Sequence, residues 1–289
     1  YQALAGFTTG GSNTAIGYQA IPYATTPNNI VALGYRAGYN LSTGQANVFI
    51  GANAGNQLTT DQYVTAVGYN AGYYSEGGIG NKYNSYFGAA AGYRGGPGIH
   101  QTYIGGEAGV YATGSYNTFV GGNAGKGGTT SAPYSSGYGN TALGYNALAG
   151  HTTAAQNVAI GYEAGNDVTT GHNNVNIGAS TGEKITTGVS NICIGTQAGK
   201  DLTDTNYNVF IGHAAGYTSD KSFGTFVGHS AGLYIDDGDS NTAIGNWAMR
   251  GSGDGSDAGE NVVIGYRAGY VMDDGDYNVI IGADAGLAL

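Results

Sequence analysis

Short apolar segments recur at a regular spacing along the whole chain. A good copy is the run Asn-Val-Phe-Ile-Gly at residues 47–51, followed by Ala54 and Gly55. Such segments, rich in β-branched and aromatic residues and bounded by Asn and Gly, are typical of short β-strands. The closing glycine occurs sixteen times, and ten of the fifteen intervals between copies are 17 residues long. This periodicity predicts a repeat architecture.

A repeat of 17 residues is too short for a pair of helices, so we expect an all-β fold. Each repeat supplies one strand that ends at the closing glycine, a second strand around Tyr-x-Ala-Gly, and a returning loop. Stacking the repeats predicts a parallel β-solenoid or β-roll of about 16 coils, with residues 1–289 as a single repetitive domain. The opening residues 1–6 match residues 145–150, so we expect a fragment of a longer fibrous chain.

The alternation of side chains along each strand predicts which columns face inward. We number the strand positions from the Asn (first) to the closing glycine (fifth). The fourth position is always apolar and the second is Thr, Val, Ile or Ser, so these two columns are expected to line the interior. The third position then points outward, although it is also apolar in nearly every coil.

A strand that is apolar on both faces is normally buried on both faces. An unbroken apolar column on the outside of the roll predicts an interface with other copies of the chain, and three copies around one axis are the expected solution. The residues assigned to this trimer interface are Phe49, Tyr86, Tyr103, Phe119, Cys193, Phe210, Phe226, Val263 and Ile280.

Asn occupies the first position in twelve of the sixteen coils. A stacked column of amides can hydrogen-bond from coil to coil, so we interpret it as a structural ladder.

The motif Asn-Thr-Ala-Ile-Gly, at residues 13–17 and again at 241–245, resembles the head repeats of YadA-like trimeric autotransporter adhesins. Similar repeats occur in phage tail-fibre proteins. The resemblance implies a left-handed roll, a homotrimer, and an adhesive role outside the cell, on a bacterial surface or a virion tail fibre. The implied partner is a glycan or a protein on a host-cell surface.

Composition and net charge limit the kinds of partner and environment that we expect. The 289 residues include 56 Gly and 25 Tyr, and 9 Lys and Arg stand against 19 Asp and Glu, a formal charge of −10. This charge weighs against a nucleic-acid partner. Apolar runs stay well below the ~18 residues of a membrane-spanning helix, so we expect no membrane span in this segment. The single cysteine cannot form an internal disulfide.

Acidic residues cluster near the C-terminal end, at repeated offsets before the Asn column. Stacked coils would bring their carboxylates together, and oxygen ligands suit Ca²⁺, so calcium is the candidate cofactor at this cluster. Turn chemistry is the alternative reading, because Asp-Asp-Gly is a good turn sequence. The candidate calcium ligands are Asp236, Asp237, Asp239, Asp254, Asp257, Asp273, Asp274 and Asp276.

The longest interval between closing glycines contains a six-residue insertion within residues 127–139. Its Pro133, Tyr134 and Tyr138 are candidate receptor contacts, because an aromatic loop on a regular scaffold suits binding to sugar or protein. Packing over a neighbouring coil is the alternative.

We therefore predict a non-enzymatic shaft or head of a trimeric adhesin or tail fibre that attaches to a cell surface. One alternative is a single-chain solenoid that binds ice or glycans through repeated Thr pairs such as residues 169–170. Another is a glycan-cleaving tailspike, which needs paired carboxylates in a groove.

Overall fold

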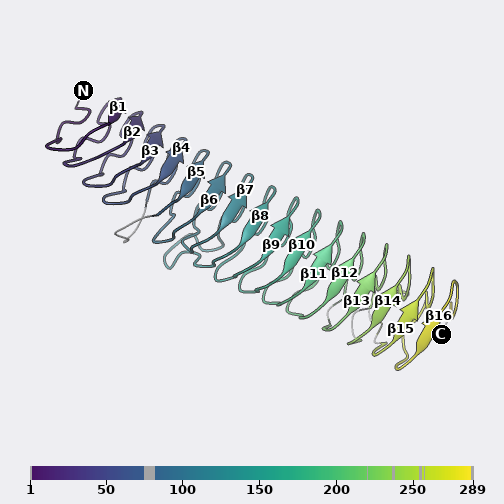
Figure 1. Cartoon of the computed structure of the whole chain (residues 1–289). Coiled ribbons are helices and arrows are strands. Elements are labelled where there is room, and N and C mark those ends of the chain that lie inside the picture. Colours follow the sequence, from purple (N-terminus) through teal and green to yellow (C-terminus); the bar gives the residue numbers. More distant parts are fainter. Residues whose placement is uncertain are drawn as a thin grey trace. The chain divides into compact units, whose positions relative to one another are not determined.

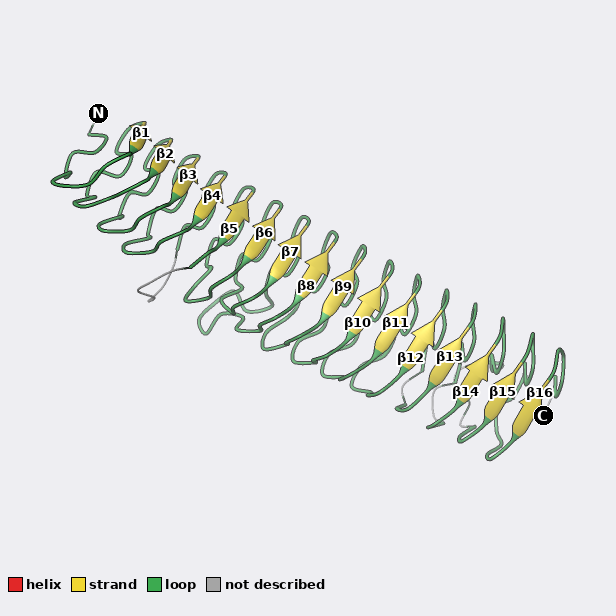
Figure 2. Ribbon diagram, in the orientation of Figure 1, coloured by secondary structure: helices red, strands yellow, loops and turns green. Residues whose placement is uncertain are grey.

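The computed structural model describes residues 2–74, 82–219, 221–235, 238–253, 256 and 258–287. They form two units, one made of Tyr1–Asn146 with Gly150–Thr153 and the other of Ala147–Ala149 with Ala154–Leu289. Each unit is by itself an all-β parallel solenoid, as predicted, and every strand is three residues long. Strands joined by loops and turns make up the described residues, which contain no helix (Figure 2).

The first unit holds eight strands that follow one another in chain order (Figure 1). Neighbouring strands pair in parallel and in register, so that Val48 lies opposite Thr65, one repeat later. The strands are β1 (Thr14–Ile16), β2 (Val31–Leu33), β3 (Val48–Ile50), β4 (Thr65–Val67), β5 (Ser85–Phe87), β6 (Thr102–Ile104), β7 (Thr118–Val120) and β8 (Thr141–Leu143).

The second unit repeats this arrangement with eight further strands, paired in parallel in chain order. They are β9 (Val158–Ile160), β10 (Val175–Ile177), β11 (Ile192–Ile194), β12 (Val209–Ile211), β13 (Thr225–Val227), β14 (Thr242–Ile244), β15 (Val262–Ile264) and β16 (Val279–Ile281). Sixteen strands match the sixteen copies of the repeat.

Each coil contributes a single strand, so the predicted second strand around Tyr-x-Ala-Gly is wrong. The residue two after the closing glycine has a positive φ, 53° at Arg36 and 58° at Asn53. This left-handed conformation turns the chain and ends the extended segment. The alanine that follows is buried, as at Ala37 and Ala54.

The closing glycine is required by the close approach of successive coils. At Gly51 φ is 127°, and a Cβ there would lie 2.6 Å from the carbonyl oxygen of Gly68 in the next coil. Any side chain at this position would therefore force neighbouring coils apart, and only glycine adopts this φ without strain.

The orientation predicted for the strands is inverted in the structure. The third position points into the interior of the chain's own solenoid, and the second and fourth positions point outward. The nine residues assigned to a trimer interface are instead core residues, all less than one tenth exposed: Phe49, Tyr86, Tyr103, Phe119, Cys193, Phe210, Phe226, Val263 and Ile280.

The reason for the inversion is that the first position, Asn, is buried on the same side as the third. Asn47 Nδ2 donates a hydrogen bond to Asp61 O at 2.8 Å, and its Oδ1 accepts one from Val64 N at 2.9 Å. The polar column thus satisfies its hydrogen bonds inside the core, with groups of the next coil. The predicted amide ladder is confirmed, but it lies inside the solenoid.

The second and fourth strand positions form what we call the outer stripe. At the fourth position every coil carries an apolar residue that is at least partly exposed. The most exposed large apolar members of the outer stripe are Ile16, Phe87, Ile104, Leu143, Ile192, Ile211, Ile244, Val279 and Ile281.

Candidate receptor-binding site

The six-residue insertion is fixed to the coils on both sides of it. On one side Thr113 N donates to Ser135 O at 2.7 Å, and Ser135 N donates to Tyr111 O at 3.0 Å. On the other side Ser136 N donates to Thr152 O at 2.7 Å. These backbone hydrogen bonds hold the insertion as an ordered part of the first unit.

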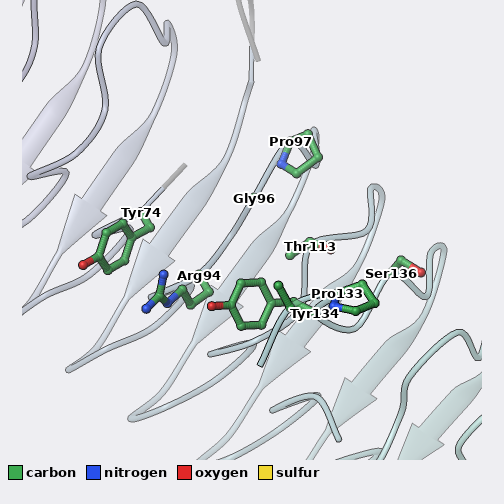
Figure 3. Close-up of a pocket in the computed structure, with 9 residues that line it drawn as sticks. Tyr74, Arg94, Gly96, Pro97, Thr113, Pro133, Tyr134 and Ser136 are labelled. Carbon is green, nitrogen blue, oxygen red and sulfur yellow. The ribbon is translucent and has the colours of Figure 1, made fainter. Parts of the chain in front are cut away.

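A cavity of about 250 Å³ lies where the insertion meets the preceding coils. Figure 3 shows Arg94 between the rings of Tyr74 and Tyr134, with Pro133 and Thr113 nearby. Apolar and aromatic walls with a few polar groups are typical of ligand-binding cavities. The lining residues are Tyr74, Arg94, Gly96, Pro97, Thr113, Ala132, Pro133, Tyr134 and Ser136.

Cation–π contacts place the side chain of Arg94. Its Cζ lies 4.0 Å from the centroid of the Tyr74 ring, 5.3 Å from that of Tyr134 and 5.6 Å from that of Tyr93. Tyr134 also stacks on Tyr111, with the ring centroids 6.1 Å apart. Burial raises the pKa of the Tyr93 hydroxyl above its ordinary value.

Two of the three predicted receptor contacts, Pro133 and Tyr134, line this cavity together. The third, Tyr138, is 53% exposed and lines an adjoining depression of about 500 Å³, together with Tyr116. The two hollows share Pro97, Thr113 and Ser136.

Sequence reasoning missed Tyr74 and Arg94, which supply the far wall of the cavity. Arg94 could have been found in the sequence by aligning the repeats with one another. Arg94 follows its Ala-Gly by the same number of residues as Tyr111, and Arg94 N donates to Val110 O at 2.8 Å in the next coil. Stacking the repeats would therefore have placed Arg94 beside the coil that contacts the insertion.

Of the candidate calcium ligands, Asp236, Asp237, Asp254 and Asp257 lie outside the described residues. Three others, Asp239, Asp273 and Asp276, accept hydrogen bonds from backbone N–H groups of the preceding coil, at 3.0, 2.7 and 2.8 Å. The donors are Ser222 N, Ser252 N and Gly259 N. Asp274 is exposed.

These contacts use the three carboxylates to join successive coils. Hydrogen bonds from Ser252 lower the pKa of the Asp273 carboxyl. In the part of the chain that the structure describes, no three His, Cys, Asp or Glu side chains gather closely enough to hold a metal ion. Calcium binding that also uses the remaining four aspartates stays a prediction.

The repeated Thr pairs use part of their hydroxyl groups for the fold. Thr8 Oγ1 donates to Thr25 O at 2.8 Å, and Thr169 Oγ1 donates to Thr186 O at 3.0 Å. The first hydroxyl of such a pair thus stabilises the stacking of coils, which weakens the case for a free hydroxyl array that binds ice.

Comparison of the chain with protein-family models, with curated proteins and with solved structures finds no match. The resemblance to adhesin head repeats therefore stays a prediction. Within the described residues, no helix has the length and apolar character needed to cross a membrane.

Proposed function

We propose that the chain is a structural and adhesive fibre module that works without catalysis. In this proposal three chains associate as left-handed solenoids through the outer stripe, and the assembly presents its loops to a cell surface. An extracellular location, on a bacterial surface or a virion tail fibre, follows from this role.

The outer stripe is the observation that carries the proposal. The interior of each chain is filled by its own third-position side chains, yet an apolar residue remains at least partly exposed at the fourth position of every coil. A contiguous apolar surface of this kind marks an interaction site on a soluble protein. Because similar repeats present this surface coil after coil, a second and third copy of the same chain are the proposed partners.

The cavity on the insertion is the proposed contact with the receptor. It interrupts an otherwise regular series of coils, and its aromatic walls are formed by Tyr74 and Tyr134. Amphipathic aromatic rings of this type bind both sugars and protein side chains. The receptor of the proposed module is a surface glycan or a surface protein.

Sedimentation equilibrium tests the association. We expect a mass of three chains for the wild type and a mass of one chain for the double variant Ile211→Asp/Ile244→Asp. Thr187→Asp, at an exposed site off the outer stripe, is the matched control and should stay trimeric. A wild-type mass of one chain would overturn the trimer.

Attachment is tested separately, with fluorescently labelled protein applied to bacterial and animal cells. We expect saturable binding that falls when Tyr134→Ala is introduced. Absence of binding to every cell type would overturn the adhesive role, whatever the oligomeric state.

A further inference from the structure

A column of exposed tyrosines follows the closing glycines of the first unit, and its longest interruption covers three successive coils. Where the column is intact its rings stack, as Tyr18 does on Tyr35 with the centroids 5.6 Å apart and the planes within 9°. In the coils of β5, β6 and β7, the residue after the closing glycine carries no ring: it is Ala89, Gly106 and Gly122, respectively.

The interruption forms a slot of about 520 Å³ between Tyr69 and Tyr145. These two tyrosines are 60% and 50% exposed and stand at its ends, four coil steps apart, or ~19 Å at the usual strand spacing. Between them, the floor at Gly106 is open, because a Cβ built there would meet no described atom within 4 Å. The slot is long enough for a short oligosaccharide lying along the solenoid axis.

Polar groups line one side of the slot. Glu107 forms an ion pair with Lys126 at 2.7 Å, and Asn123 Nδ2 donates to Asn146 Oδ1 at 3.2 Å. Glu107 and Ala90 also border a second depression of about 250 Å³, so the hollow continues around the coil. The rim thus offers carboxylate and amide groups, and Lys126 balances the charge of Glu107.

We infer that this slot, between Tyr69 and Tyr145, is a binding site for a neutral oligosaccharide. The C–H face of a pyranose ring packs against the electron-rich face of an aromatic ring, and the two end tyrosines offer such faces. Sugar hydroxyls donate to the Glu107 carboxylate and to the Asn123 carbonyl oxygen, and they accept from amide N–H groups. A glycine floor lets the ligand approach the backbone closely.

The charge balance favours a neutral sugar over an acidic one. A uronic or sialic acid would place a second carboxylate beside Glu107, whose own charge is already matched by Lys126. This inference rests on the proposed attachment function for its biological role, but direct binding tests it independently.

The experiment uses the full chain and three neutral trisaccharides, maltotriose, cellotriose and triacetylchitotriose, titrated by calorimetry, alongside an array of neutral and acidic glycans. Gly106→Tyr should fill the slot, because other coils carry Tyr at this position. Ala52→Tyr, in the same column but outside the slot, is the matched control. Tyr69→Ala removes one end wall without adding bulk.

We expect at least one neutral glycan to bind the wild type and Ala52→Tyr alike. Gly106→Tyr should abolish binding, and Tyr69→Ala should weaken it about tenfold, which corresponds to one large aromatic contact. Circular dichroism and thermal melting establish that the variants are folded.

Two results would overturn the inference: no neutral glycan binds, or binding survives Gly106→Tyr in the folded variant. If cells still bind the protein in either case, the attachment function stands and only the slot is rejected. If cell binding is also absent, both proposals fail.

Discussion

The Oδ1 atom of Asn174 accepts two hydrogen bonds from Asn191, one from its backbone N–H at 2.9 Å and one from its Nδ2 at 3.1 Å. Asn191 in turn accepts from Asn208 N at 3.1 Å and donates to Thr205 O at 2.8 Å. These amides are fully buried, and Asn191 thus links its coil to both neighbouring coils.

Replacing Asn191 with Leu should destabilise the second unit by about 3 kcal/mol, because it leaves the buried N–H of Asn208 and the carbonyl of Thr205 without partners. Urea unfolding followed by circular dichroism measures the loss. Thr187→Ala, at an exposed site in the same coil, should change the stability by less than about 0.5 kcal/mol. Equal effects of the two substitutions would contradict the structural role of the ladder.

The inward orientation of the third strand position is tested by two adjacent residues of β12. Phe210 is fully buried and stacks on Phe226 with the centroids 5.0 Å apart, whereas Ile211 lies on the outer stripe. Phe210→Ala should cost about 3–5 kcal/mol in unfolding free energy. Ile211→Ala should cost much less when unfolding is measured on dissociated chains. A reversal of this order would restore the orientation predicted from the sequence.

The repeat, the parallel fold and the number of coils could be predicted because they depend on spacing alone. The orientation of the strands could not be predicted, because the third and fourth strand positions are both apolar. The hydrophobic pattern alone does not show which of them faces the interior. The first-position Asn does not resolve the choice, because polar side chains are ordinarily exposed. Its burial becomes favourable only once the next coil supplies partners, as Asp61 and Val64 do for Asn47.

The candidate site likewise contains residues that the sequence could predict and residues that it could not. Pro133 and Tyr134 stood out because they interrupt the repeat, and the structure places both at the cavity. Tyr74 and Arg94 belong to earlier coils, and stacking rather than sequence proximity brings them there. The slot between Tyr69 and Tyr145 depends on the absence of aromatic rings at three successive coils, which is visible only after the coils are aligned.

Asn176 is the polar exception in the third column. It is fully buried, and among the described residues neither its Oδ1 nor its Nδ2 has a hydrogen-bond partner. Replacing it with Val, of similar volume, should stabilise the protein by about 1–3 kcal/mol, since an unsatisfied buried amide carries a cost of that size. A rise in melting temperature checks this. A fall would mean that the amide has a partner such as an internal water molecule.

Cys193 should be chemically inert in the folded protein. Burial raises the pKa of its thiol to about 12, so the reactive thiolate is only ~10⁻⁴ of the total at pH 8. We expect no labelling of the native protein by iodoacetamide at this pH within hours, and complete labelling in denaturant, both measured by mass spectrometry. Rapid labelling of the native form would show that β11 opens readily.

Asp273 should contribute a pH-dependent increment of stability. Hydrogen bonds from the side chain and backbone of Ser252 lower its pKa below the ordinary 3.8, so the folded state holds the ionised form more tightly than the unfolded state does. The contribution is therefore present above about pH 4 and is lost as the pH falls through the folded-state pKa. Because the carboxylate is partly exposed, it should stay below about 1 kcal/mol. Asp273→Asn should lower the melting temperature slightly at pH 7, and the difference from the wild type should shrink as the pH falls below 4. Ser252→Ala should raise the Asp273 pKa in a carbon-13 NMR titration, whereas an unchanged pKa would show that Ser252 is not the cause.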